Sequence, residues 1–218
     1  MRLELDHIFV ATSEPDVLES ALADCDIAFT RRQVHEGQGT ANACAVFDNA
    51  FLEILWATDR KDLLSEAVAP LGLDERTRWR ETGACPFGVC FRATTRPDRW
   101  PFPSWQYVPS YAPAGIPIAT PPGALADPLV FITVRPPDAG AKRGPDAASH
   151  AGARRVLTRV ALHRPPSQPL SPAVSWFVEE GLLNIHDAAE HRLELEWDAG
   201  RQGRSHRSAT QPSMVLLW

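Results

Sequence analysis

Two side chains stand out for their chemistry, His7 and Glu53, because each is a lone ionisable group inside an apolar strand. Side chains alternate between the faces of a strand, so His7 is expected to share a face with Leu5 and Phe9, and Glu53 with Leu55. Burying a carboxylate is costly unless another group pairs with it or coordinates it. An imidazole and a carboxylate can form a hydrogen bond, act as an acid/base pair, or bind a divalent metal ion.

The elements that must position this pair follow one another closely. A strand over residues 3–11 leads into a helix for which Ser13 is a good N-cap and in which Pro15 tolerates the first turn. A strand over residues 27–35 follows. The stretch 35–56 then predicts two further strands joined by a tight Asp-Asn turn, and Glu53 lies on the second of them.

Parts of this order return later in the chain. The segment Leu157-Thr-Arg-Val-Ala-Leu corresponds to Leu5-Asp-His-Ile-Phe-Val in its position within the unit. A helix start of the Ser-Pro type follows in both units. The closing strands also match, since Met214-Val-Leu-Leu-Trp has the same apolar tail as Leu52-Glu-Ile-Leu-Trp. A self-similarity of this length indicates repeated modules. We expect a single α+β domain over residues 1–218, with module one at 1–58, a degenerate middle module at about 83–136 and a last module at about 150–218.

Composition excludes several classes of partner. The formal net charge of −5 argues against nucleic acid, because phosphate binding needs a basic surface. The chain has no run of about 18 apolar residues, so no membrane span is expected. The four cysteines have no CxxC spacing, which favours buried reduced thiols and a cytoplasmic protein.

A β-α-β-β-β unit that opens with Leu5-Asp-His and closes with Leu52-Glu-Ile-Leu resembles the vicinal oxygen chelate superfamily. The Gly-Gln-Gly-Thr-Ala-Asn run that starts at Gly37, the Phe87-Gly-Val-Cys-Phe-Arg-Ala-Thr strand and the segment at His150 look more like its glyoxalase-like branch. The resemblance implies paired modules that curl into a cupped, barrel-like mixed sheet, with helices on the outside. Such modules complete their cups within one chain or between two, so a homodimer is one expected form.

The resemblance also implies a metal site. In the superfamily a His on the first strand and a Glu on the fourth hold the ion, and these positions fall on His7 and Glu53. Zn, Mn, Fe or Ni would suit such ligands. The partner positions depart from the pattern. They fall on Arg159 and Val215 in the last module, or at about Val89 and Thr133 in the middle one.

Further residues are candidates for ligand binding. His35, Gln38 or His150 can supply a third metal ligand, and His35 and Gln38 also border the region of the acid/base pair. Asn42 is a candidate pocket residue or a turn cap. Arg159 can pair with Glu53 if the modules face each other, which would make an anion or salt-bridge site. Aromatic residues near Trp105 can line an apolar pocket or pack the proline-rich segment around them.

Two functions remain open at this point. The first is a metal-dependent lyase, isomerase or dioxygenase that acts on a small carbonyl or vicinal-oxygen substrate, with Glu53 and His7 as catalytic residues. The second is a non-catalytic protein that sequesters a small molecule in the same pocket. The missing partner ligands favour the second, and the His/Glu pair favours the first.

Overall fold

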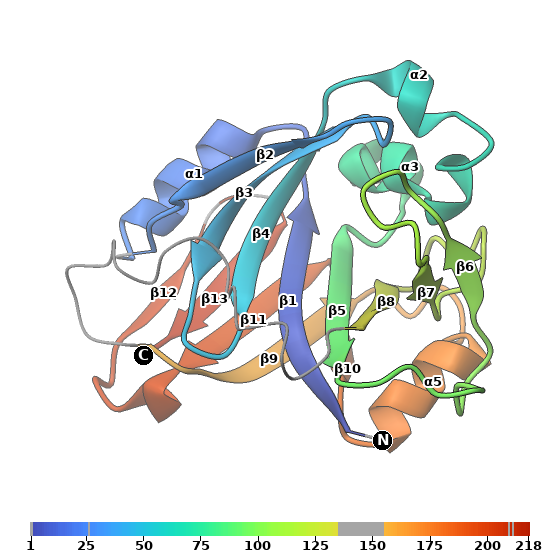
Figure 1. Cartoon of the computed structure of the whole chain (residues 1–218). Helices are drawn as coiled ribbons and strands as arrows, with labels where there is room; N and C mark the ends of the chain where they lie inside the picture. Colours follow the sequence, from blue (N-terminus) through green and yellow to red (C-terminus); the bar gives the residue numbers. More distant parts are fainter. Residues whose placement is uncertain (1, 26, 135–154, 209, 211) are drawn as a thin grey trace.

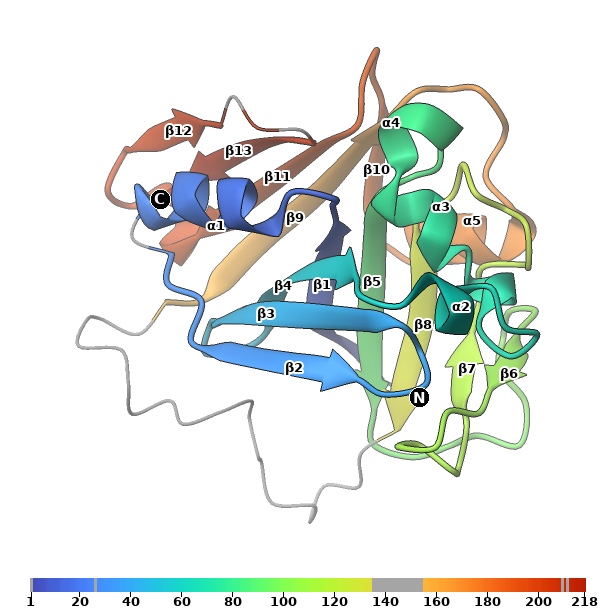
Figure 2. The same cartoon turned by 90° about the horizontal axis from the view of Figure 1, so that it is seen from above.

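The computed structural model describes residues 2–25, 27–134, 155–208, 210 and 212–218. Two mixed β-sheets lie face to face and bury the main core between them (Figures 1 and 2). The expected α+β class and curved mixed sheets are confirmed, although the sheets do not close into a barrel.

The first sheet repeats one four-strand arrangement. In its first half β1 lies parallel to β4, and β3 and β2 follow outward; in its second half β5 lies parallel to β8, and β7 and β6 follow. The antiparallel neighbours β1 and β5 join the halves at the centre. The strands are β1 (Leu3–Ala11), β2 (Arg31–His35), β3 (Thr40–Val46), β4 (Phe51–Ala57), β5 (Phe87–Ala93), β6 (Trp105–Tyr107), β7 (Ile116–Ile118) and β8 (Leu129–Val134).

The second sheet is built from the last part of the chain and does not copy module one strand for strand. Its order is β10-β9-β11-β13-β12, so β13 lies parallel to β11 and not to β9. The expected equivalence of Arg159 and Val215 with His7 and Glu53 is therefore wrong, because β11 separates their strands. The strands are β9 (Leu157–Arg164), β10 (Asn184–Asp187), β11 (Arg192–Trp197), β12 (Ser205–Arg207) and β13 (Ser213–Leu217).

Short helices cover both sides of the first sheet. The inner side packs against α1 and α5 as well as the second sheet. The opposite side is covered in part by the segment that holds α2 and α3 (Figure 2). None of the helices in the described part of the chain has the length and apolarity to cross a bilayer. The helices are α1 (Pro15–Ala23), α2 (Arg60–Leu63), η1 (Ala69–Leu71), α3 (Leu73–Thr77), α4 (Trp79–Thr82), α5 (Pro172–Glu179) and η3 (Asp198–Gly200).

The central strands of the first sheet are buried on both faces. On the inner face Ile8 and Ile54 belong to the same core as Trp197 and Met214 of the second sheet, and all four are fully buried. On the outer face Phe9 belongs to a smaller apolar cluster that includes residues of the α2–α3 segment. Polar side chains on this outer face are thus enclosed, and the candidate site lies among them.

The corner between β2 and β3 depends on Gly39. Its φ of +77° is a conformation that residues with a Cβ rarely adopt. A Cβ at this position would lie 2.2 Å from the carbonyl oxygen of Asp59 and 2.9 Å from the backbone nitrogen of Leu63. The oxygen of Gly39 accepts hydrogen bonds from the backbone nitrogens of Thr58 and Asp59. Gly39 therefore fixes the β2–β3 corner against the start of α2.

We expect Gly39→Ala to destabilise the protein by about 3 kcal/mol or more, because positive-φ strain and a backbone overlap add together. Gly37→Ala is the matched control. Gly37 also has positive φ, +73°, but a Cβ there meets no atom within 4 Å. Its expected cost is about 1 kcal/mol. Urea unfolding of both variants measures the difference, and equal costs would contradict the role of this contact.

Candidate active site

A β-bulge in β1 turns His7 toward the outer face of the sheet. Leu5 pairs with Phe91 and His7 with Cys90, so Asp6 is an extra residue with no partner of its own on β5. Leu5 therefore packs against the inner core, whereas His7 and Phe9 face the opposite side. The expected shared face of Leu5 and His7 is wrong, because alternation restarts after the bulge.

The bulge also lets two carboxylates reach one imidazole. Asp6 Oδ2 lies 2.9 Å from His7 Nδ1, and Glu53 Oε2 lies 3.5 Å from His7 Nε2. All three side chains are nearly enclosed, with exposures of 3%, 11% and 7% for Asp6, His7 and Glu53. The imidazole stacks on Phe51 with ring centroids 4.3 Å apart, and the edge of Phe131 meets it at 5.4 Å.

These neighbours decide the charge of His7. Burial alone lowers the pKa of an imidazole. Here the interactions with Cys90, Asp6 and Glu53 outweigh burial and raise the pKa of His7 to about 10. When no metal ion is bound, His7 is thus an imidazolium at neutral pH, placed between two carboxyl groups.

Glu53 is held on its other oxygen by Asn42. The Asn42 amide nitrogen Nδ2 donates to Glu53 Oε1 at 2.7 Å and lies 3.3 Å from His35 Nε2. A carboxylate only accepts, so this contact fixes the orientation of the amide. His35 Nε2 must then accept, which makes His35 neutral. Burial lowers the pKa of His35, in agreement with this form.

The hydrogen-bond chain continues from His35 to two phenols. His35 Nδ1 contacts Thr40 Oγ1 at 2.9 Å, and Thr40 donates to Gln38 Oε1 at 2.7 Å. Gln38 Nε2 then donates to Tyr107 Oη at 3.3 Å and to Tyr111 Oη at 3.0 Å. Burial raises the pKa of both tyrosines, so the phenols are protonated at neutral pH. Gln38 thereby links the first half of the sheet to β6 and to the loop after it.

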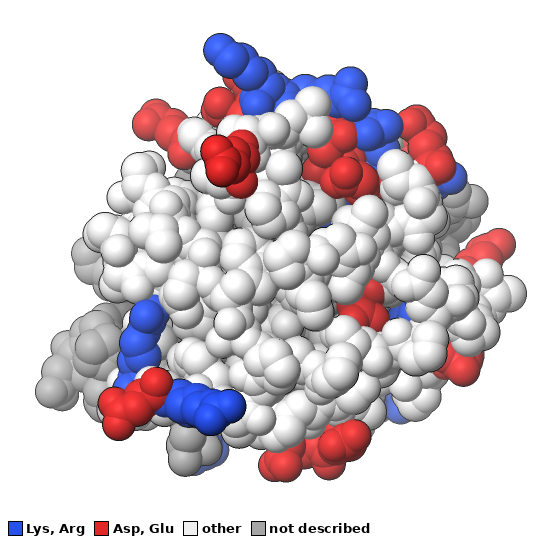
Figure 3. All heavy atoms as spheres, turned by 90° about the vertical axis from the view of Figure 1, so that its right-hand side faces the viewer, with Lys and Arg blue, Asp and Glu red and all other residues white. Residues whose placement is uncertain are grey.

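A pocket of about 220 Å³ lies over this network. His7, Glu53, Asn42, Gln38 and His35 line one side of it. Much of the remaining wall is apolar and includes Phe9, Leu55, Leu71, Leu73, Ile118 and Phe131. Figure 3 shows the side of the molecule that carries the β6–β7 hairpin, where most of the surface is uncharged. The pocket therefore combines a few polar groups with walls suited to an apolar molecule.

The second half of the sheet supplies no histidine or carboxylate in the positions that correspond to this pair. Glu53 lies two residues beyond Phe51, the partner of His7 on β4. By the same register, Thr133 lies two residues beyond the partner of Cys90 on β8. Cys90, not Val89, is therefore the counterpart of His7, since Val89 faces the inner core. On the pocket side, the described residues offer an ion His7 Nε2 and Glu53 Oε2, while Thr133 contributes only a neutral hydroxyl.

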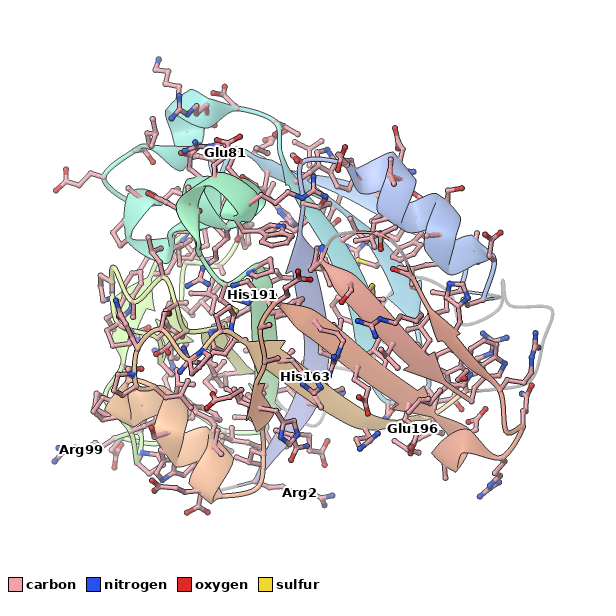
Figure 4. The ribbon with its side chains drawn as sticks, turned by 180° about the vertical axis from the view of Figure 1, so that it is seen from behind. Arg2, Glu81, Arg99, His163, His191 and Glu196 are labelled. Carbon is pink, nitrogen blue, oxygen red and sulfur yellow. The ribbon has the colours of Figure 1, made fainter. Side chains whose placement is uncertain are left out.

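Two sequence candidates lie away from the pocket. Arg159 is on the second sheet, where it pairs with Glu194, so it does not meet Glu53. The same sheet surface carries His163 and Glu196 (Figure 4). The Trp105 indole donates to the Thr120 carbonyl at 2.9 Å, and its side chain is not among those that line the pocket. The remaining candidate, the third-ligand residue at position 150, lies outside the described residues.

The sequence did not predict Asp6 or Thr40 as members of the network. Tyr107 and Tyr111 are among the aromatic residues proposed to line a pocket, and both do so, but their hydrogen bonds to Gln38 were not predicted. A bulge leaves no mark in the alternation of apolar residues, so Asp6 was expected on the face opposite His7. The tyrosines lie in a proline-rich stretch without a periodic pattern. The group of aromatic residues around Trp105 was the only sequence feature that pointed to a pocket here. It did not distinguish the tyrosines, which line the pocket, from Trp105, which does not.

Comparisons with known proteins agree with this architecture. Residues 5–100 match the family model described as a glyoxalase-like domain. A hypothetical protein from Staphylococcus aureus, 9% identical, aligns over 99% of both chains with a TM-score of 0.60, which shows a shared fold. Methylmalonyl-CoA epimerase from Mycobacterium tuberculosis is 15% identical over 63% of this chain and 91% of its own, with a TM-score of 0.39. No curated protein sequence matches the chain.

The charge of His7 gives a pH-dependent stability. Its folded pKa of about 10 lies above the ordinary value of 6.5, so its contribution is complete below pH 6.5 and is lost as pH rises toward 10. The stability difference between wild type and His7→Gln should shrink by at least about 2 kcal/mol over this range in ion-free protein. Urea unfolding at several pH values measures it, with His163→Gln as the control. A constant difference for His7→Gln would contradict a charged His7.

Proposed function

We propose, from the premise that this chain carries a glyoxalase-like domain of the vicinal oxygen chelate superfamily, that its pocket is the active site of an enzyme. The reaction moves a proton next to a carbonyl or vicinal-oxygen group of a small substrate. The observation that carries the proposal is the enclosed pair of His7 and Glu53, 3.5 Å apart on the pocket wall.

The symmetry of the sheet argues that this pair is more than structural. The second half of the sheet has the same strand order but places Cys90 and Thr133 in the corresponding positions. The arrangement of strands therefore does not require a charged pair. Burial of charged groups costs free energy, and a cost that the fold does not require is typical of functional sites.

The geometry assigns different roles to the two residues. Glu53 is the base that removes a proton from the carbon beside the substrate carbonyl. The electron pair of that C–H bond moves into the enolate, and the Nε2–H of His7 stabilises the negative oxygen. Return of the proton from Glu53 to a neighbouring atom gives the isomerised product. Asn42 holds the carboxylate in place through its second oxygen.

The remaining walls indicate the substrate class. The volume of about 220 Å³ suits a small molecule, and the apolar side chains suit a short hydrocarbon body. The protonated phenols of Tyr107 and Tyr111 offer donors to a second substrate oxygen. These features favour a carbonyl compound with an adjacent oxygen, and they support an isomerase or lyase more directly than a dioxygenase.

A metal ion on the pocket side fits these residues poorly. His7 Nε2 and Glu53 Oε2 would hold Zn, Mn, Fe or Ni, and the ion would polarise substrate oxygens. Catalytic sites for such ions usually have three protein ligands. The described residues offer two on this side, so we assign no reaction step to an ion there. The His7–Glu53 metal site stays a prediction.

A second candidate function is sequestration of an apolar small molecule without catalysis. The predominantly apolar walls of the pocket favour it. A homodimer and a cytoplasmic location also stay predictions from the sequence. All four cysteines are buried and outside disulfide bonds, which agrees with a reducing compartment.

Glu53→Gln should slow proton transfer by at least about 100-fold, because the amide cannot act as a base. The measurement is exchange of carbon-bound protons in D₂O, followed by NMR over a panel of small 2-hydroxy ketones and 2-oxo acids. Glu194→Gln, on the second sheet, is the matched control and should retain the wild-type rate.

Equal exchange by wild type and Glu53→Gln would contradict the assigned base. If wild type exchanges no compound of the panel but binds one of them in the pocket, the sequestering function is the correct one. Protection of Tyr107 and Tyr111 signals by that compound would locate the binding.

A further inference from the structure

The opposite side of His7 contains a second group of potential ligands. Asp6, His7 and Cys90 each offer one ligand atom, and these atoms all lie within 4.8 Å of one another. The three residues are 3%, 8% and 0% exposed. Across the described ranges of the chain, no other group of three or more His, Cys, Asp or Glu residues is as compact.

The backbone explains why these three residues meet. The bulge at Asp6 brings its carboxylate to the Nδ1 side of the imidazole, at 2.9 Å. The β1–β5 register places Cys90 directly opposite His7. The Cys90 thiol interacts with His7, and its sulfur also lies 3.7 Å from Thr133 Oγ1 and 3.6 Å from the Phe91 carbonyl oxygen. The second carboxylate oxygen of Asp6, Oδ1, lies 4.0 Å from Arg92 Nη1.

Glu53 completes an arrangement that is common around metal-binding histidines. Such a histidine binds the ion through one ring nitrogen and donates the other N–H to a carboxylate. With an ion at Nδ1, His7 keeps its Nε2–H toward Glu53 Oε2. Asn42 already fixes that carboxylate. A carboxylate thus lies beside each ring nitrogen, Asp6 at Nδ1 and Glu53 at Nε2, and only an ion at Nδ1 leaves Glu53 outside the ligand set.

We propose that Asp6, His7 and Cys90 form a metal site on the sheet side of the pocket wall, and that its thiolate makes the site select Zn²⁺ over Mn²⁺ and Mg²⁺. Thiolate, imidazole and carboxylate ligands together suit zinc, whereas Mn²⁺ and Mg²⁺ prefer oxygen ligands. The thiol proton and the Nδ1 proton leave to solvent when the ion binds. The site goes beyond the proposed function and leaves Glu53 free to act as the base.

Titration of ion-free protein with Co²⁺ tests the ligand set, because a thiolate ligand gives a charge-transfer band in the near ultraviolet. The band should form in wild type and disappear in Cys90→Ser. Asp6→Asn should weaken Co²⁺ binding by at least about 10-fold. Cys44→Ser is the matched control, since Cys44 is a buried thiol directly opposite Glu53 on β3, and it should keep the band.

Glu53→Gln separates the two sides of His7, and it should also keep the band. Co²⁺ that binds without the band, and whose binding is lost in Glu53→Gln, would overturn the proposal in favour of an ion at His7 and Glu53. Absence of Co²⁺ binding would show that the cluster holds protons only. Neither result affects the proton-exchange test of Glu53.

Competition on the wild-type protein gives an independent readout that needs no variant to fold. Zn²⁺ should displace bound Co²⁺ and abolish the band at a concentration at least about 100-fold lower than Mn²⁺ requires. Equal displacement by the two ions would contradict thiolate ligation. Far-ultraviolet circular dichroism of each variant confirms that a lost band reflects a lost ligand.

Discussion

The enclosure of one imidazole between two carboxyl groups is the constraint on which the rest of the site depends. Asp6, His7 and Glu53 are all buried, and a lone buried charge would be strongly destabilising. The imidazolium offsets part of the negative charge, and Asn42 donates to the carboxylate that faces the pocket. The direction of every later hydrogen bond in the chain toward the tyrosines follows from that one amide. The bulge in β1 makes the whole arrangement possible.

Sheet packing contributes to the burial of Asp6, His7 and Glu53. The second sheet covers the inner face of the first with buried residues such as Trp197 and Met214, and the pocket lies on the opposite face. The two halves of the first sheet contribute different side chains to the pocket. The first half contributes His7 and Glu53, and the second contributes Phe131, Thr133 and the phenol of Tyr107. A substrate would thus lie between the charged pair and side chains that are neutral at pH 7.

Much of this could be predicted from the sequence, and the failures have a common cause. Strand alternation and the repeated unit gave the fold class, and with the family resemblance they placed His7 and Glu53 together. Alternation could not reveal the bulge, which exchanged the positions of Leu5 and Asp6. The apolar residues that end at Trp218 could not show that β11 lies between β9 and β13. Arg159 was therefore wrongly equated with His7. Both features depend on pairing between distant strands, which local patterns do not encode.

The most direct test of this account is the protonation state of His7, measured by ¹⁵N NMR of the ring nitrogens in ion-free protein at pH 7. The account predicts that both nitrogens carry a proton, because the carboxylates of Asp6, 2.9 Å from Nδ1, and Glu53, 3.5 Å from Nε2, favour the charged ring. A neutral ring with one bare nitrogen at pH 7 would contradict it. Such a ring would show that the pair is an ordinary neutral hydrogen bond, and the proposed roles of Glu53 and His7 would then lose their basis.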